Sequence, residues 1–228
     1  MSKAKPTKTA KWGFILSPRF AAICGILGPL VGFSSIGAAV ALSASWFNWF
    51  IHALSDLGNP VMLGGFYGIL GWNPAAPIFN GGMFATGVLA TLFGLQLFLI
   101  QRRQKSLAGM TGGVLFMVAM LCLAGVGIFN EVLILGHIIT AAGFFFATML
   151  ASIAYGVALL RIAKSRLLGS LTLIMGIVIL VTLVMMFGRL LPFAGAAIPE
   201  MIVAVAAFAW VVPLSIHLYL SAARPRPK

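Results

Sequence analysis

Six long runs of apolar residues, separated by shorter polar segments, set the pattern along the chain. A helix needs about 20 apolar residues to cross the roughly 30 Å hydrocarbon core of a bilayer, and each run reaches that length. Because lipid offers the backbone no hydrogen bonds, each run must form a helix. The pattern predicts an all-α fold, a polytopic membrane protein with a bundle of six transmembrane helices, at about 20–44, 78–100, 108–129, 132–160, 167–188 and 198–221.

The segment that joins the first two spans, Trp46 to Asn80, is the longest connection between runs. It contains no lysine or arginine, and it holds Asp56, one of only three acidic residues. Aromatic residues crowd it, and such rings prefer the level of the lipid headgroups. We therefore expect an interfacial outer loop with one or two short helices, broken at Gly58-Asn59-Pro60 and at Asn73-Pro74.

Basic residues mark one side of the predicted bundle. If six runs cross the membrane, all but one of the 15 Lys and Arg residues fall on the side of the two termini, and only Arg189 falls on the other. Short segments rich in Lys and Arg stay in the cytoplasm. We therefore expect a basic cytoplasmic tail at residues 1–19, a single transmembrane domain at 20–221 and a basic cytoplasmic tail at 222–228.

The first run has a second interpretation, as a secretory signal sequence. Basic residues precede it, and Ala41-Leu42-Ser43-Ala44 resembles a small-residue cleavage site. The apolar part of a signal sequence is usually about 7–15 residues long, however, and this run is far longer. We therefore take this run as an uncleaved span.

The sequence shows no eukaryotic sorting signal, which favours the plasma membrane of a prokaryote as the location.

Composition and charge agree with this interpretation. The 228 residues are 61% hydrophobic and 8% charged, with a mean hydropathy of +1.11, which excludes a water-soluble domain of this size. The net charge of +12 lies in short clusters between spans, so we expect contacts with membrane lipids and no nucleic-acid partner. Cys24 and Cys122 lie inside apolar runs without CxxC spacing and indicate neither a disulfide nor a zinc framework.

Polar side chains that could carry chemistry gather on the side opposite the basic clusters. His137 would lie about 7–8 Å below the start of the fourth span at 1.5 Å per residue, and ionisable groups at such depth usually face a bundle interior or a cavity. Asp56 and Glu131 are the accompanying acids. We predict Asp56, Glu131 and His137 as catalytic candidates, and Ser55, Asn59, Asn80, Arg189 and Glu200 as substrate-binding candidates.

Each candidate also has a structural explanation. Glu131 and Glu200 stand where a carboxylate stabilises the first turn of a helix, Asp56 can begin or end a short helix, and His137 can donate to a backbone carbonyl. The sequence has no GxSxG, HExxH or glycine-rich phosphate loop, and His217 falls on the opposite side, which argues against a three-histidine zinc site. Metal and cofactor stay open.

Short motifs between the spans resemble a known family. They are Ser55-Asp56-Leu57-Gly58, Phe79-Asn80 with Gly87, Gly127-Ile128-Phe129-Asn130-Glu131, His137 and Glu200. In this order they resemble the six-span membrane proteins catalogued as domain of unknown function 998. That family resembles six-span eukaryotic proteins linked to lipid and GPI-anchor remodelling or to autophagy.

The resemblance implies the six-span architecture and a shared outer polar site at Asp56, Asn80, Glu131 and His137, and it implies no reaction. The chain departs from the family pattern at two positions. Asn130 stands where the family usually has proline, and Met201 stands where it often has arginine after the last acid.

Three functions remain as hypotheses. The first is an enzyme or binding protein for a lipid or another amphiphile at the outer leaflet, in which Asp56 or Glu131 would be a base or cation ligand and Arg189 a headgroup clamp. The second is a transporter or channel for a small solute or ion, although the inner halves of the spans offer few polar residues. The third is a non-catalytic membrane subunit, with a homo-oligomer or a partner membrane protein as its assembly.

Overall fold

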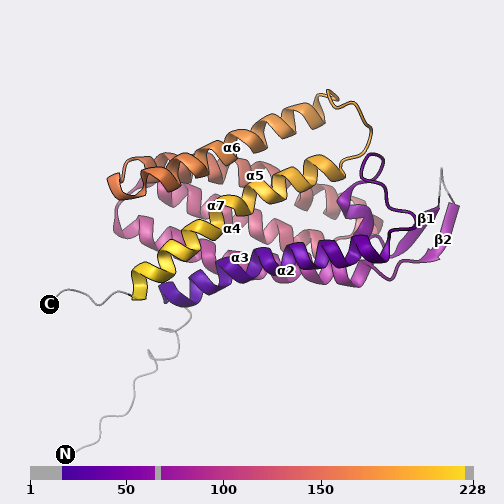
Figure 1. The fold of residues 1–228 in the computed structure, drawn as a ribbon, viewed down its shortest axis with the longest axis horizontal. Helices are drawn as coiled ribbons and strands as arrows, with labels where there is room; N and C mark the ends of the chain where they lie inside the picture. Colours follow the sequence, from indigo (N-terminus) through magenta and orange to yellow (C-terminus); the bar gives the residue numbers. More distant parts are fainter. Residues whose placement is uncertain (1–16, 65–67, 224–228) are drawn as a thin grey trace, which may run out of the picture.

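The protein is a bundle of six long helices, described by a computed structural model over residues 17–64 and 68–223 (Figure 1). All six are long and apolar enough to span a membrane, so the predicted all-α, six-span architecture is confirmed. Residues 1–16 of the predicted tail at 1–19 and residues 224–228 of the predicted tail at 222–228 lie outside the described residues. The helices are α2 (Pro18–Leu42), α3 (Ala76–Arg103), α4 (Leu107–Ile128), α5 (Ile134–Leu160), α6 (Arg166–Phe187) and α7 (Ala197–Ala223).

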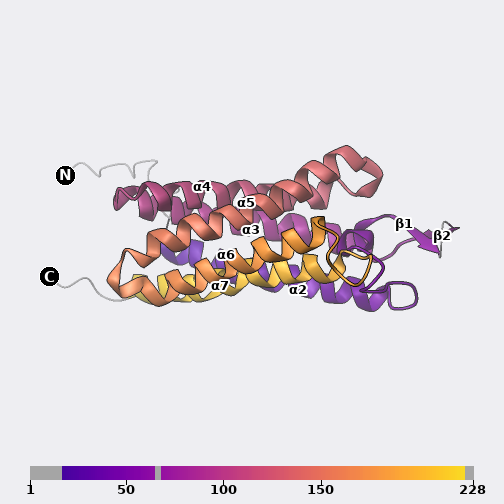
Figure 2. The same ribbon diagram turned by 90° about the horizontal axis from the view of Figure 1, so that it is seen from above.

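The helices form a closed ring. Each one packs against the next in sequence, and α7 returns to pack along α2 (Figures 1 and 2). By contrast, α5 and α7 scarcely touch one another, and α6 packs against both. α6 therefore fills the gap between α5 and α7 and completes the ring. The interior lies between α2, α3, α4, α5 and α7.

The contact between α3 and α4 depends on glycine. Gly87 faces the backbone of Met120 and Ala124 so closely that a side chain there has no room. Such close approach through small residues is the usual way in which helices associate in lipid. On the outside of the ring, large apolar side chains such as Leu30, Leu121 and Ile139 stay exposed, which suits a lipid-facing surface.

The long connection between α2 and α3 is where the structure departs from expectation. A short 3-10 helix, η1 (Leu54–Gly58), ends at the expected break, but the following residues form an antiparallel hairpin of β1 (Val61–Gly64) and β2 (Gly68–Trp72). Of the one or two short helices expected, the described part of the loop has one, and the hairpin that follows it was not expected. Glycines recur between residues 64 and 71, and glycine disfavours a helix, so short extended segments pair instead.

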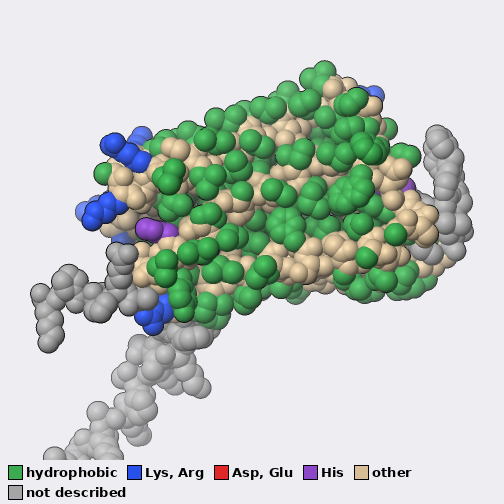
Figure 3. Space-filling model, in the orientation of Figure 1, with side chains coloured by type: hydrophobic (Ala, Val, Ile, Leu, Met, Phe, Trp, Pro, Cys, Tyr) green, Lys and Arg blue, Asp and Glu red, His purple; other side chains and the backbone are tan. Residues whose placement is uncertain are grey.

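Charge divides the bundle into two ends. Figure 3 shows one face of the molecule, on which most of the Lys and Arg side chains lie at one end. We call the end with the α3–α4 and α5–α6 turns, near Arg102, Arg103, Arg161 and Lys164, the basic end. The opposite end carries η1, the hairpin and all three acids, and we call it the acidic end. Arg189, in the turn after α6, is the one basic residue at the acidic end among the described residues.

Candidate functional site at the acidic end

The helix η1 lies across the acidic end of the ring and organises the polar side chains there. Asp56 closes its own turn, because the Ala53 N–H donates to Asp56 Oδ2 at 3.0 Å. Asn80, in the first turns of α3, donates from Nδ2 to the Gly58 carbonyl at 2.8 Å. η1 is therefore capped by its own acid and tied to α3.

Glu131 reaches η1 from the other side of the ring. It begins the one-turn helix η3 (Glu131–Leu133) that precedes α5. Ser55 Oγ donates to Glu131 Oε1 at 2.8 Å, and Asn59 Nδ2 donates to Oε2 at 3.4 Å. The turn itself is capped by Asn130, whose Oδ1 accepts from the Val132 N–H at 3.1 Å. Asn130 therefore caps this turn, and Glu131, for which a capping role was one explanation, binds Ser55 and Asn59 of the loop instead.

Glu200 completes the group from the first turn of α7. Its Oε2 accepts from the Leu54 N–H at 2.6 Å. The start of α7 is held beside η1 by backbone bonds, because the Gly195 N–H donates to Phe50 O and the Ala197 N–H donates to His52 O, both at 2.9 Å. Three carboxylates from three parts of the chain therefore converge on one five-residue helix.

Among the described residues, the carboxylates at η1 have no cationic partner. Across residues 17–64 and 68–223, no Lys or Arg forms an ion pair with Asp56, Glu131 or Glu200. Burial, reinforced by the charge and hydrogen bonding of Glu131, raises the pKa of Asp56 to about 7. Two carboxyls that interact so closely share a proton more readily than both ionise.

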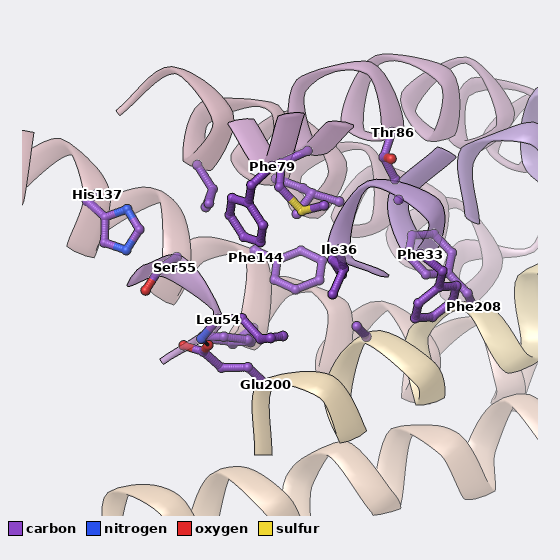
Figure 4. Close-up of a pocket in the computed structure, with 17 residues that line it drawn as sticks. Phe33, Ile36, Leu54, Ser55, Phe79, Thr86, His137, Phe144, Glu200 and Phe208 are labelled. Atoms are coloured by element: carbon purple, nitrogen blue, oxygen red, sulfur yellow. Dashed lines mark hydrogen bonds between the residues drawn. The ribbon is translucent and has the colours of Figure 1, made fainter. Parts of the chain in front are cut away.

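A cavity of about 70 Å³ opens beneath η1, inside the ring (Figure 4). Leu54, Ser55, His137 and Glu200 lie together at one side of it, and Phe33, Thr86 and Phe208 lie at the other side. Phe33 and Phe208 meet edge-on, with ring centroids 5.9 Å apart. The cavity is therefore polar toward the loop and almost wholly apolar in its depth. Its remaining lining is Gly32, Ile36, Phe79, Met83, Leu123, Val126, Ala141, Phe144, Phe145 and Ala204.

His137 is the predicted residue that enters this cavity from α5. It is 8% exposed, and its Nδ1 lies 2.9 Å from the Phe129 carbonyl. A carbonyl only accepts, so Nδ1 carries the hydrogen and Nε2 of the neutral ring is an acceptor. No described residue donates to Nε2. The hydrogen bond to a backbone carbonyl thus accounts for Nδ1, and Nε2 remains available to a molecule in the cavity.

The chain matches one family model over residues 26–217, which includes η1, Glu131, His137 and Glu200. It belongs to the family described as protein of unknown function (DUF998). The resemblance seen in the order of the short motifs is thereby confirmed. No curated protein and no solved structure matches the chain.

The structure places the two positions at which the sequence departs from the pattern expected from the resemblance. Asn130 caps η3 and so leaves Glu131 for η1. Met201 lines an apolar groove between α6 and α7. No acid–arginine pair forms at Glu200 in the part of the chain that is described.

The structure brings most predicted site residues together and leaves one out. Ser55, Asp56, Asn59, Glu131 and Glu200 meet at η1, and Asn80 supports it. Arg189 is exposed, and its side chain makes no contact with the acids within the described ranges. Nor do any three His, Cys, Asp or Glu side chains of those ranges lie close enough to hold a metal ion.

Two kinds of residue were missed by sequence reasoning. Asn73 is fully buried and donates to the carbonyls of Leu57 and Asn59 at 3.1 and 2.8 Å, although the Asn73-Pro74 pair indicated only a break. The aromatic lining from Phe33, Phe79, Phe144 and Phe208 was also missed. Single apolar residues in apolar spans give no signal of which face they occupy.

Proposed function

We propose that this protein binds an amphiphile, a lipid or a molecule built like one, in the cavity beneath η1. The observation that carries the proposal is the division of the cavity, with Ser55, His137 and Glu200 at one end and Phe33, Phe208 and other apolar side chains in its depth. An amphiphile has the same division. Binding sites for small molecules commonly combine an apolar wall with a few polar groups that fix orientation.

We further propose that the acidic end faces outward from a prokaryotic plasma membrane, so that the ligand comes from the outer leaflet. The support is the basic end, since loops rich in Lys and Arg stay cytoplasmic. Green fluorescent protein fused after Lys228 should fluoresce, whereas alkaline phosphatase at that position should be inactive. Alkaline phosphatase fused after Arg189 should be active. The reverse pattern would overturn the orientation.

The same geometry favours binding over catalysis for two of the acids. Asp56 and Glu131 do not line the cavity, and their oxygens accept bonds from Ala53, Ser55 and Asn59. We assign them the role of holding η1 over the cavity. Among the catalytic candidates, His137 is the one that lines the cavity.

Blocking the apolar depth of the cavity tests the proposal. Ala204 lies one turn beyond Glu200 on α7 and lines the cavity, so Ala204→Phe should fill it. Val88→Phe adds the same ring at an exposed position on α3 and is the matched control. Organic extracts of the purified proteins should contain an amphiphile in the wild type and in Val88→Phe, and should lack it in Ala204→Phe. Equal content in all three would overturn the proposal.

A second candidate function, passage of a small polar solute through the bundle, is favoured by buried polar residues toward the basic end. Gln101 Nε2 donates to Tyr155 OH at 3.4 Å, and Tyr155 stacks on Trp210. In the described structure Gln101 Oε1, Thr148 Oγ1 and Trp210 Nε1 are buried without a partner. Buried polar groups normally bind protein or ordered water, so we infer water among these residues.

The two functions separate in proteoliposomes. Solute passage predicts flux above that of empty liposomes, and it predicts that Gln101→Leu lowers this flux while amphiphile binding stays unchanged. Absence of flux for small cations, anions and polyols, with amphiphile binding retained, would leave the first function alone.

A further inference from the structure

Among the described residues, the donor groups at the polar end of the cavity are engaged in hydrogen bonds, whereas its acceptors are less so. The Ser55 hydroxyl donates to Glu131, and the Leu54 N–H donates to Glu200. The amides of Asn59 and Asn80 donate to Glu131 and to Gly58 O. Each of these donor groups therefore helps to hold the loop, and Asn59 and Asn80 do not line the cavity.

The acceptors at the same place keep unused capacity. A carboxylate has about four acceptor positions, and the backbone N–H groups of Leu54 and Ser55 account for two of those on Glu200. Ser55 Oγ retains lone pairs beside its donated bond. In the neutral ring His137 Nε2 is an acceptor because Nδ1 donates to Phe129 O, and no described group binds Nε2. Three acceptors thus border one end of the cavity, from η1, α5 and α7 (Figure 4).

Three carboxyl groups and, among the described residues, one basic residue stand at this end. Glu200 borders the cavity, and Asp56 and Glu131 stand directly behind Ser55. Arg189, the described basic residue at the acidic end, is exposed and does not contact them. A phosphate or carboxylate group here would face three carboxyl groups and no adjacent cation among the described residues, and like charges repel.

We propose that the bound amphiphile carries an amine as its head group, held as an ammonium by Glu200, Ser55 Oγ and His137 Nε2, with its apolar chain toward Phe33 and Phe208. This inference rests on the proposed amphiphile site and specifies its ligand. A primary ammonium has three donors and no acceptor, which matches the three acceptors, one of which is the Glu200 carboxylate. The earlier expectation of Arg189 as a clamp on an anionic headgroup finds no support in these contacts.

The test compares four twelve-carbon amphiphiles that differ only in the head: dodecylamine, dodecyltrimethylammonium, dodecanol and dodecanoate. Each competes at pH 8 with radiolabelled dodecylamine for the wild-type protein in nanodiscs of zwitterionic lipid. The amine should bind at least about tenfold more tightly than the alcohol, as expected for hydrogen bonds to a charged group. The quaternary cation lacks N–H donors and should fall between them, and dodecanoate should not compete.

Variants assign the effect to residues. Glu200→Gln keeps an acceptor for the Leu54 N–H and removes the charge, so it should lower affinity for the amine about tenfold and leave the alcohol unchanged. His137→Phe should weaken the amine and spare the quaternary cation. Arg189→Gln is the control and should change neither. If Glu200→Gln fails to fold, the ranking of the four heads on the wild type and on His137→Phe decides alone.

The outcomes distinguish the two proposals. If all four heads compete equally and Ala204→Phe abolishes binding of each, the amphiphile site stands and the amine inference is overturned. Tightest binding of dodecanoate, lost in Arg189→Gln, would also overturn it. If none of the four competes saturably, the amphiphile site fails with it. If the amine binds as proposed, the organic extract of the wild type shows whether the natural amine belongs to a membrane lipid or to a free amphiphile.

Discussion

The two ends of the bundle carry charge in opposite ways. At the basic end, Arg102, Arg103 and Arg161 are exposed in short turns between consecutive helices. At the acidic end, three half-buried carboxylates accept hydrogen bonds from η1 and from Ala53, the residue before it. The basic charges can be solvated wherever the turns place them. The acidic groups need partners, because burying a carboxylate without a partner is costly. Their hydrogen bonds therefore indicate a specific polar site.

The connections differ in the same sense. The α3–α4 turn runs from Gln104 to Ser106, whereas residues 43–75 and 188–196 cross the acidic end. The two acidic-end loops bond to one another through Gly195 and Ala197. Length at this end is therefore used to cover the ring and to bring Glu200 to η1. The comparison predicts that substitutions at the acidic end cost more stability than substitutions at the basic end.

Asn73→Ala should give the largest effect. The side chain makes two donated bonds and accepts a third from the Ala75 N–H at 3.0 Å, all in buried surroundings. Losing them leaves buried backbone groups unpaired, so we expect a loss of about 3 kcal/mol. That corresponds to roughly 6–12 °C in the unfolding midpoint measured in detergent.

Gln104→Ala is the control for this substitution, because Gln104 is exposed and lies at the basic end. Its side chain should be worth less than about 0.5 kcal/mol. Equal midpoints for the two variants would break the contrast between the ends.

A pH titration should give the next largest effect. The pKa of Asp56 is raised to about 7 from its ordinary value of 3.8. A raised pKa means that the folded state holds the proton more tightly, so this contribution to stability is full below about pH 4 and is lost as pH rises through 7. Solvent screening of the half-buried Asp56 reduces the loss, and we expect about 1–2 kcal/mol.

Asp56→Asn should flatten this pH dependence, since asparagine can still accept from the Ala53 N–H and does not titrate. The measurement is the unfolding midpoint of both proteins between pH 4 and pH 8, in one detergent and at one ionic strength. Parallel curves for the two proteins would show that Asp56 does not carry the titration.

Much of the fold could be predicted from the sequence, because lipid requires a helix wherever about 20 apolar residues follow one another. The ring and the cavity could not. Ser55 and Glu131 are 76 residues apart, and their meeting depends on how α2, α3 and α5 pack. The same holds for Phe33 and Phe208, which are ordinary span residues by sequence and neighbours in the ring. The hairpin was missed because its extended segments are too short to show alternation.

The smallest predicted effect concerns a feature that the two ends share. Lys105, after α3 at the basic end, and Arg189, after α6 at the acidic end, have φ values of 55° and 54°. In both, the next residue donates to the carbonyl four residues before the left-handed one, from Ser106 to Gln101 O and from Leu190 to Met185 O. This is the helix ending in which glycine is favoured.

Lys105→Gly and Arg189→Gly should therefore each stabilise the protein, by up to about 1 kcal/mol, because glycine adopts a positive φ without the steric cost of a Cβ. If Arg189 had a hidden role in holding the carboxylates of the acidic end, Arg189→Gly would destabilise the protein while Lys105→Gly stabilised it. Equal gains in the unfolding midpoint would instead show that the acids rely on η1 alone. The difference between the unfolding midpoints of Lys105→Gly and Arg189→Gly therefore tests whether Arg189 stabilises the carboxylates of the acidic end.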